Sequence, residues 1–240
     1  MPEKNLKQRI HNGETIVGVS VPIGATQERL EAVLNQDHYD FVSTDSQHAA
    51  FNEERLVAFC AMANELNVPV QFRIKHTRNA YLIGNYLDLG PSGIEVPQVE
   101  RESTVDEAIA YFYYPQIGIR SWGGVARKGT NERSDRLAYA QWWNEYGVLW
   151  MQIESVESVT NARKLAKLGV DCLSFGPADL TFSIEGHPHH PFKTVDDGVR
   201  HVAKQLEGTG VAVCFRNGGP DTRGKYAEMG VTVFLENPIS

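Results

Sequence analysis

The sequence predicts a single (β/α)8 barrel, or TIM barrel, that spans residues 1–240. Three observations favour this fold. Short apolar runs rich in β-branched residues alternate with helix-like segments along almost the whole chain, without a return to an antiparallel pattern. Polar residues stand at the carboxyl ends of several runs, where barrel enzymes carry their catalytic side chains. A chain of 240 residues, 42% of them hydrophobic, suits one barrel domain with a large core.

The expected elements follow one another in strand–helix pairs. Strand-like runs occupy 15–21, 39–45, 68–73, 93–97, 148–151, 172–175, 210–215 and 231–235. Helix-like segments occupy 27–34, 53–66, 79–89, a segment that opens at 104, 135–146, 156–168 and 223–229. The helix at 156–168 is expected to bury an apolar face made of Val156, Val159, Ala162, Leu165, Ala166 and Leu168.

Several boundaries carry residues that suit helix ends. Asn52 and Ser155 are expected to be N-caps, because their side chains can accept a hydrogen bond from a free backbone N–H of the first turn. Gly90 and Gly169 are expected to end helices. Thr104 opens a Thr-Val-Asp-Glu sequence that fits a capping box, so we expect it to mark a helix start.

Two stretches interrupt the alternation. Residues 113–131 are rich in glycine and aromatic residues with interspersed basic ones, and a long irregular segment on a barrel rim is more often functional or interface-forming than idle. Residues 187–191, His-Pro-His-His-Pro, look like a metal cluster at first sight. Two prolines hold this stretch as a turn, so a surface loop is the preferred interpretation.

Composition narrows the function classes. The formal net charge of -7 and the lack of a Lys/Arg cluster argue against nucleic acid as a partner. Cys60, Cys172 and Cys214 lie far apart in apolar segments, which indicates reduced core thiols and a reducing cytoplasm. No apolar segment is long enough to span a bilayer, and the polar N-terminus does not resemble an export signal. We therefore expect a cytoplasmic protein without a membrane partner.

Five side chains of complementary chemistry follow separate strands. Asp45 ends the second strand and His48 follows it; Arg73 ends the third, Glu154 the fifth, and Asp179 follows the sixth. Two carboxylates converging on one rim suit a hard divalent cation such as Mg²⁺ or Mn²⁺. For this pair alone an equal alternative stays open, in which Glu154 caps a helix and Asp179 turns the chain. All five together favour a functional site.

The motifs around these residues resemble the HpcH/HpaI class II pyruvate aldolases from about Leu6 to Glu236. Residues 45–49, Asp-Ser-Gln-His-Ala, are similar to the family's Asp-Gly-Glu-His-Ala, and Phe72-Arg73 matches its strand-three arginine. Gln152-Ile153-Glu154 is similar to its Gln-Val-Glu, and residues 176–180, Gly-Pro-Ala-Asp-Leu, match outright. Residues 118–120 and 123–127 look like its Gly-x-Arg and its glycine-rich basic loop.

This resemblance implies a role for each site residue. Glu154 and Asp179 would hold a divalent metal ion, most often Mg²⁺ or Mn²⁺, with Co²⁺ or Zn²⁺ as further options. Arg73 would bind and polarise a 2-oxo acid, and His48 with Asp45 would form an acid/base dyad. The substrate-binding set implied by the matching motifs is Arg73, Gln152, Gly176 and Ala178.

The chain departs from the family pattern at two places. Gln47 stands where the family usually has Glu, which removes a negative charge near the proposed metal. The chain also ends soon after its eighth strand, so we expect it to lack the family's usual extra C-terminal helix, which packs on a neighbouring subunit. The resemblance still implies a homo-oligomer.

The resulting hypothesis is a metal-dependent aldolase that makes or cleaves 4-hydroxy-2-oxo acids. Its partners would be a small 2-oxo acid such as pyruvate and an aldehyde, joined through an enolate stabilised by the cation and Arg73. One alternative is another metal–enolate C–C lyase, such as an oxaloacetate decarboxylase or a citrate-lyase-type enzyme. A second is a metal-binding barrel without catalytic activity.

Overall fold

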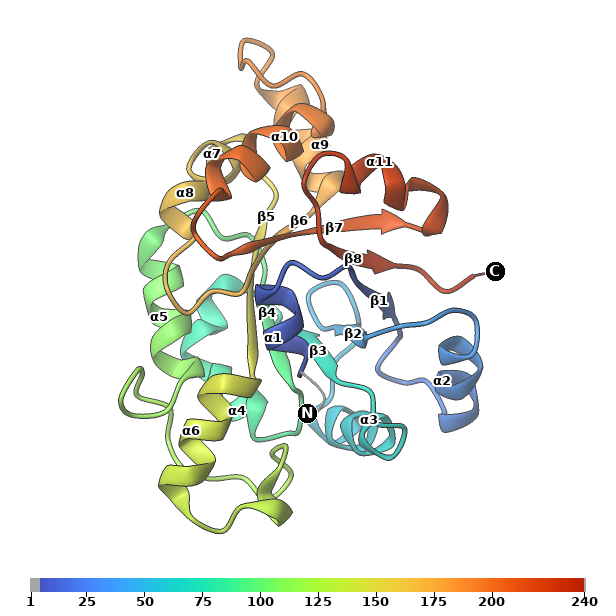
Figure 1. The fold of residues 1–240 in the computed structure, drawn as a ribbon, viewed down its shortest axis with the longest axis vertical. Helices are drawn as coiled ribbons and strands as arrows, with labels where there is room; N and C mark the ends of the chain where they lie inside the picture. Colours follow the sequence, from blue (N-terminus) through green and yellow to red (C-terminus); the bar gives the residue numbers. More distant parts are fainter. Residues whose placement is uncertain (1–4, 240) are drawn as a thin grey trace.

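The structure, a computed structural model that describes residues 5–239, is a closed barrel of eight parallel strands in the order β1 to β8 (Figure 1). Closure comes from the parallel pairing of β1 with β8, which includes Val17 opposite Phe234. The barrel fold predicted from the sequence is thus confirmed. The strands are β1 Ile16–Ser20, β2 Phe41–Asp45, β3 Val70–Arg73, β4 Gly93–Val96, β5 Val148–Ile153, β6 Cys172–Phe175, β7 Ala212–Gly218 and β8 Val233–Glu236.

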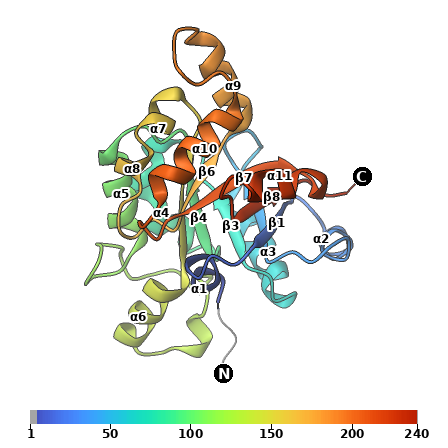
Figure 2. The ribbon, with the colours of Figure 1, turned by 45° about the horizontal axis from the view of Figure 1, so that its top comes forward.

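Helices surround the strands, and the α9–α10 segment projects beyond the rest of the barrel in both views (Figures 1 and 2). Helices α1, α9 and α10 were not expected from the sequence. The helices are α1 Leu6–His11, α2 Gln27–Leu34, α3 Glu53–Glu65, α4 Ile83–Leu87, α5 Glu102–Phe112, α6 Arg136–Tyr146, α7 Val156–Thr160, α8 Ala162–Leu165, α9 Pro177–Gly186, α10 Val195–Leu206 and α11 Arg223–Ala227, with 3-10 turns η1 Thr77–Leu82, η2 Thr130–Glu132 and η3 Pro220–Thr222.

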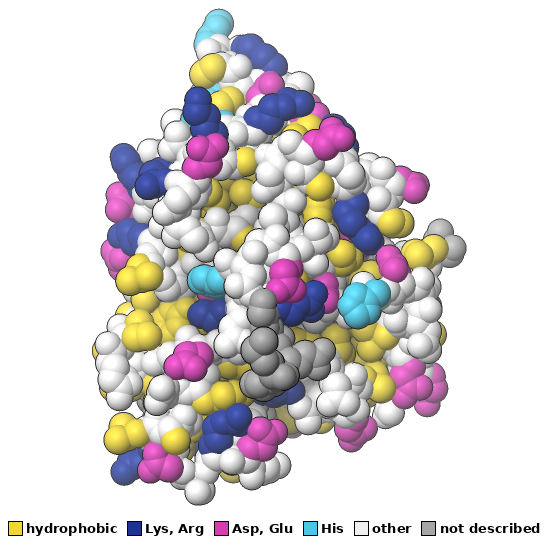
Figure 3. Space-filling model, viewed as in Figure 1, with side chains coloured by type: hydrophobic (Ala, Val, Ile, Leu, Met, Phe, Trp, Pro, Cys, Tyr) yellow, Lys and Arg dark blue, Asp and Glu magenta, His cyan; other side chains and the backbone are white. Residues whose placement is uncertain are grey.

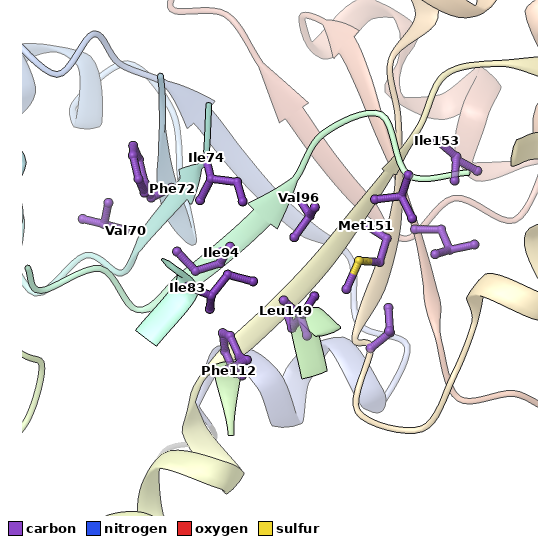
Figure 4. Packing of buried hydrophobic residues seen from close by; sticks show 14 of the residues in the cluster. Val70, Phe72, Ile74, Ile83, Ile94, Val96, Phe112, Leu149, Met151 and Ile153 are labelled. Atoms are coloured by element: carbon purple, nitrogen blue, oxygen red, sulfur yellow. The ribbon is translucent and has the colours of Figure 1, made fainter. Parts of the chain in front are cut away.

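The apolar side chains form two separate layers, because successive strand residues point to opposite faces of the sheet. The larger layer lies between the barrel and its helices, and Figure 4 shows part of it, with β3, β4 and β5 contributing alternate residues such as Phe72, Ile94 and Met151. This layer fixes which residues of each strand face outward. The remaining residues of each strand must face the barrel interior.

The second layer fills the lower part of the barrel. The rings of Phe41 and Trp150 meet edge to face there, with centroids 5.2 Å apart. Leu6 and Ile10 of α1 belong to the same cluster, so α1 closes the amino-terminal end of the barrel. The opposite, carboxyl end is left for polar side chains.

Two of the predicted caps are confirmed and one is wrong. Asn52 accepts a hydrogen bond from the Arg55 N–H, and Ser155 forms a capping box at α7. Thr104 does not start a helix, because α5 already begins at Glu102 after an N-cap without a side-chain hydrogen bond. Val105, Ala108 and Phe112 of α5 are buried, and the capping sequence at Thr104 lies within the helix.

The helix predicted at 156–168 is also wrong in part. It is broken into α7 and α8 at Asn161 and stops at Leu165, and the Leu168 side chain, expected in the apolar face, is 99% exposed. Gly169 follows with φ +103°, a left-handed conformation that glycine adopts readily and that turns the chain toward β6. The helix predicted at 79–89 is likewise a 3-10 turn, η1, followed by the short α4.

The irregular segment 113–131 packs beside helices rather than around the carboxyl end of the barrel. The buried guanidinium of Arg120 forms an ion pair with Asp88 at 2.9 Å and stacks on the rings of Tyr114 and Trp143. Arg127 stacks in the same manner on Trp122. Both arginines of this segment therefore serve cation–π packing, whereas Lys128 donates a hydrogen bond to Asn64.

Other sequence expectations have clear outcomes. Residues 187–191 form turns and bends between α9 and α10, as expected for a surface loop, and the three cysteines are buried and free.

Among the helices of residues 5–239, none has the length and apolar character needed to cross a bilayer. Basic and acidic side chains are interspersed on the face seen in Figure 3, without a large patch of one sign.

The packing inside the barrel leads to a stability prediction. A Cβ atom at Gly18 would lie 2.1 Å from Cζ of Phe41, whose ring is already held by Trp150. Gly18→Ala should lower the free energy of unfolding by about 1–3 kcal/mol, the usual cost of overpacking a core. Gly224→Ala in α11 is the control, since nothing lies within 4 Å of its Cβ position. Urea unfolding of both variants checks this, and equal losses would contradict the packing argument.

Candidate functional site

Polar side chains meet at the carboxyl end of the barrel because they occupy inward-facing strand positions. Asp45 and Arg73 are the last residues of β2 and β3, and Gln152 lies near the end of β5. Glu95 on β4 and Arg216 on β7 complete this inward ring. The alternation that fills the lower barrel with apolar groups thus places charged groups at its mouth.

Arg73 is held by two neighbours. Its Nε donates to Asp45 Oδ1 at 2.7 Å and its Nη1 donates to Gln152 Oε1 at 3.2 Å. Burial acts to raise the pKa of Asp45, but the hydrogen bond and charge of Arg73 outweigh it, and the pKa is lowered. Asp45 is therefore ionised at neutral pH, and the guanidinium is fixed in the cavity wall.

Asp45 also organises the loop that carries His48. Its carboxylate accepts the backbone N–H groups of Gln47 at 2.9 Å and His48 at 3.2 Å. The contact between Asp45 and His48 is thus to the backbone, while the exposed His48 side chain lines the cavity. Gln47, the departure from the family motif, has its side-chain Oε1 buried without a hydrogen-bond partner within residues 5–239.

Glu154 is the most perturbed carboxyl group of the site. It is 6% exposed, and neither Oε1 nor Oε2 has a hydrogen-bond partner among the described residues. Burial, reinforced by the neighbouring charge of Asp179, raises its pKa to about 7, although Arg73 opposes the shift. A buried carboxylate with unpaired oxygens is costly unless a cation or a proton compensates it.

Gly176 has no side chain, and this leaves room for the carboxylate of Glu154. A Cβ atom at this position would lie 2.2 Å from Glu154 Oε2 and 2.9 Å from Gln152 Nε2. Its N–H already donates to the carbonyl of Ile153 at 3.2 Å. Gly176 therefore contributes room rather than a free hydrogen-bond donor.

The next residues open α9. Pro177 takes the first position of this helix, where its missing N–H is no loss, and Asp179 lies in the first turn. The N–H groups of Ala178 and Asp179 have no partner within the helix, since the first turn of any helix lacks them. Together with the helix dipole they favour an anion at this point.

Two adjoining cavities open over these groups. The first, about 380 Å³, is lined by His48, Arg73, Gln152 and the 176–179 segment. The second, about 760 Å³, extends from Asp45 and Arg73 toward β1 and α2. The residues that line both are Ser20, Arg73, Arg216 and Asn237. The structure therefore brings all the sequence-predicted site residues to one region.

Sequence reasoning missed Glu95, Arg216, Ser20 and Asn237. Glu95 could have been identified as a charged residue within the apolar run at 93–97, because an isolated buried charge needs a partner. Arg216 directly follows the run at 210–215, and the rule that singled out Arg73 applies to it equally.

The donor set for a metal ion is small. In the part of the chain that the structure describes, no group of three or more His, Cys, Asp or Glu side chains could hold a metal ion. Glu154 and Asp179 supply two carboxylates, and the unpaired oxygens of Glu154 fit a hard cation that keeps water or substrate at its other positions.

Residues 23–217 match the family model described as HpcH/HpaI aldolase/citrate lyase. The chain belongs to this family. The expected family and the expected enzyme class, a carbon–carbon lyase of the aldolase type, are thereby confirmed at the level of the HpcH/HpaI family.

Individual HpcH/HpaI proteins show how distant the similarity is. A hydroxypyruvate/pyruvate aldolase of Pseudomonas aeruginosa is 25% identical over 236 residues, which cover 96% of this chain and 85% of the relative. A 4-hydroxy-2-oxo-heptane-1,7-dioate aldolase of Shigella boydii is 26% identical, covering 95% and 86%. An HpcH/HpaI aldolase from Desulfitobacterium hafniense, 23% identical, has the same fold, with a TM-score of 0.84 over 98% of this chain and 90% of that one.

The pKa of Glu154 predicts a pH dependence of stability. Its folded-state pKa of about 7 exceeds the ordinary value of 4.5, so the folded protein holds this proton more tightly than the unfolded chain. In chelator-treated protein this contribution is present at low pH and is lost as the pH rises from 4.5 through about 7. Glu154→Gln should remove it, whereas Glu185→Gln on exposed α9 surface should not. Urea unfolding from pH 5 to 8 checks this. The same dependence of the free energy of unfolding on pH in wild type, Glu154→Gln and Glu185→Gln would refute it.

Proposed function

We propose that this protein is a divalent-metal-dependent aldolase that makes or cleaves 4-hydroxy-2-oxo acids, with pyruvate or a similar 2-oxo acid and an aldehyde as partners. The observation that carries the proposal is the buried Glu154 carboxylate, unpaired beside Asp179, close to Arg73 and the first turn of α9. The names of the related aldolases support the same reaction class.

Glu154 and Asp179 are the residues that would hold the cation. Their hard oxygen atoms suit Mg²⁺ or Mn²⁺, with Co²⁺ or Zn²⁺ as further candidates. When bound, a divalent cation supplies positive charge that stabilises an enolate oxygen. Gln47 in place of a carboxylate leaves the site with less negative charge, which favours a weaker hold on the cation.

The chain's own residues would bind and orient the 2-oxo acid. Ala178 and Asp179 offer backbone N–H groups to its carboxylate. Arg73 offers a guanidinium, fixed by Asp45 and Gln152, to the oxygen on which negative charge develops. Because Arg73 is already oriented, little entropy is lost when the substrate binds.

His48 is the proposed acid/base group. Its side chain reaches the cavity from the loop after β2, and imidazole suits proton transfer near neutral pH. In the cleavage direction His48 would accept the proton of the C4 hydroxyl as the C3–C4 bond breaks, and would then donate a proton to the CH₂ carbon of the enolate, which becomes the methyl group of pyruvate; in synthesis both transfers run in reverse. Asp45 supports it by holding the loop through the backbone N–H of His48.

The metal assignment predicts matched effects on binding and turnover. Glu154→Gln and Asp179→Asn should each lower Mn²⁺ affinity by more than about a hundredfold, since loss of a direct ligand exceeds the effect of losing a supporting residue. Isothermal titration calorimetry measures this, with Glu157→Gln on exposed α7 surface as the control. Both variants should also lose metal-dependent pyruvate release from a panel of 4-hydroxy-2-oxo acids.

The same two measurements, with oxaloacetate added as a substrate, separate the alternatives. Full Mn²⁺ affinity in both variants would make the ligand assignment wrong. Pyruvate release from oxaloacetate, but from no 4-hydroxy-2-oxo acid, would move the assignment to a decarboxylase. Mn²⁺ binding without turnover of any of these compounds would indicate a barrel that only binds metal.

The acid/base role of His48 predicts a change in proton exchange. His48→Ala should lower turnover by about a hundredfold or more and slow deuterium incorporation into the methyl group of pyruvate, because it removes the proposed acid/base group. His189→Ala in the exposed 187–191 loop is the control. Proton NMR of pyruvate in D₂O follows the exchange. Exchange at the wild-type rate in His48→Ala would reassign His48 to substrate positioning.

A further inference from the structure

An ion pair crosses the mouth of the barrel. Glu95 on β4 is fully buried, and its Oε2 accepts a hydrogen bond from Arg216 Nη2 on β7 at 2.5 Å. A buried ion pair contributes little stability compared with a well-packed apolar pair of the same size. Stability alone therefore does not explain why two charged residues occupy these inward positions.

The guanidinium of Arg216 is divided between the barrel interior and the cavities. Its Nη2 is engaged by Glu95, and its Nε is enclosed without a hydrogen-bond partner among residues 5–239. Its Nη1 is not one of the enclosed atoms and forms no hydrogen bond with another described residue. The side chain is 21% exposed and lines both cavities, so Nη1 is the nitrogen left to contact a bound molecule.

The two cavities meet at Ser20, Arg73, Arg216 and Asn237. On the proposed aldolase function, the 2-oxo acid occupies the smaller cavity, with its carboxylate at the first turn of α9 and its 2-oxo oxygen at Arg73. Its reacting carbon then has to meet an aldehyde that enters through the larger cavity. The new carbon–carbon bond therefore forms at the junction of the two cavities.

Negative charge develops on a second oxygen at this junction. In synthesis, an electron pair of the enolate forms the bond to the aldehyde carbon, and the π pair of the aldehyde moves onto its oxygen, which takes a proton from His48. Arg73 is already assigned to the 2-oxo oxygen, and the other two junction residues besides Arg216 are neutral. Arg216 is therefore the cation at the junction that is left for the aldehyde oxygen.

We propose that Arg216 is a catalytic residue that donates a hydrogen bond from Nη1 to the aldehyde oxygen as the carbon–carbon bond forms or breaks, and that Glu95 is the positioning residue that holds it. This inference rests on the proposed aldolase function. A donor fixed where negative charge appears lowers the barrier of that step. Removal of a methyl proton from the 2-oxo acid precedes this step and does not involve the aldehyde oxygen.

Two measurements separate these steps. Deuterium exchange into the methyl group of pyruvate, without aldehyde, reports proton removal, and condensation of pyruvate with glycolaldehyde or propanal reports the whole reaction. Both aldehydes are uncharged, so an effect on them cannot come from a contact to an anionic group. Arg216→Gln should lower kcat for condensation by about a hundredfold or more, the usual cost of losing one hydrogen bond to a developing oxyanion, and should retain exchange. Arg136→Gln on the exposed surface of α6 is the control and should retain both.

Further variants are needed because Arg216→Gln leaves the buried Glu95 carboxylate without its partner, which can prevent folding. Arg216→Lys keeps a positive charge but loses the planar guanidinium, so it should retain exchange and lose part of condensation. The double variant Glu95→Gln with Arg216→Met has no unpaired charge and should match the loss expected for Arg216→Gln. Glu95→Gln alone should lose less condensation, because Arg216 is present but held less firmly.

The outcomes distinguish this inference from the function on which it rests. Equal loss of exchange and condensation in Arg216→Lys and in the double variant would make the ion pair structural, and full condensation in both would remove Arg216 from the reaction. Either result overturns the inference and leaves the aldolase function standing. Wild-type protein that condenses pyruvate with no aldehyde would instead overturn the proposed function, and the role of Arg216 with it.

Discussion

Barrel closure is the constraint on which the rest of this structure depends. Once β1 pairs with β8, every second strand residue is enclosed, whatever its chemistry. The lower barrel meets this constraint with apolar packing around Phe41 and Trp150. At the carboxyl end the enclosed residues are charged, and Arg73 and Arg216 are matched by carboxylates from neighbouring or facing strands. Glu154 has no such match among residues 5–239, which is why we propose it as a ligand of a cation.

The fold was largely predictable because each strand can be recognised from a few consecutive residues. Each strand is a short apolar run, and the polar residues that end these runs point to the carboxyl end of the barrel. The runs around Asp45, Arg73 and Glu154 could therefore be read one at a time. Helix boundaries were less predictable, since Thr104 has a good capping sequence but lies inside α5. Tertiary packing outweighs a capping preference of about 1 kcal/mol.

The site was only partly predictable because some of its contacts are distant in sequence. Glu95 and Arg216 are 121 residues apart, and nothing in either local sequence shows that they pair. The contact between Asp45 and His48 was also beyond the sequence, which suggested a side-chain dyad where the structure has a backbone hydrogen bond. Local rules identify which residues reach the barrel mouth, while three-dimensional pairing decides what each one is free to do.

The closure of the barrel floor by α1 bears on the order in which the chain can assemble. Lys7 of this helix contacts Tyr113, the carbonyl of Gly147 and Asp171, at separations of 106 to 164 residues. Such non-local contacts form slowly, because long loops must close first. Leu6 and Ile10 of α1 share a cluster with residues of later strands, among them Trp150, Cys214 and Leu235, so the packing of this helix is complete only after the last strand is made. During synthesis the two apolar side chains of this otherwise polar helix therefore wait for most of the chain before they are buried.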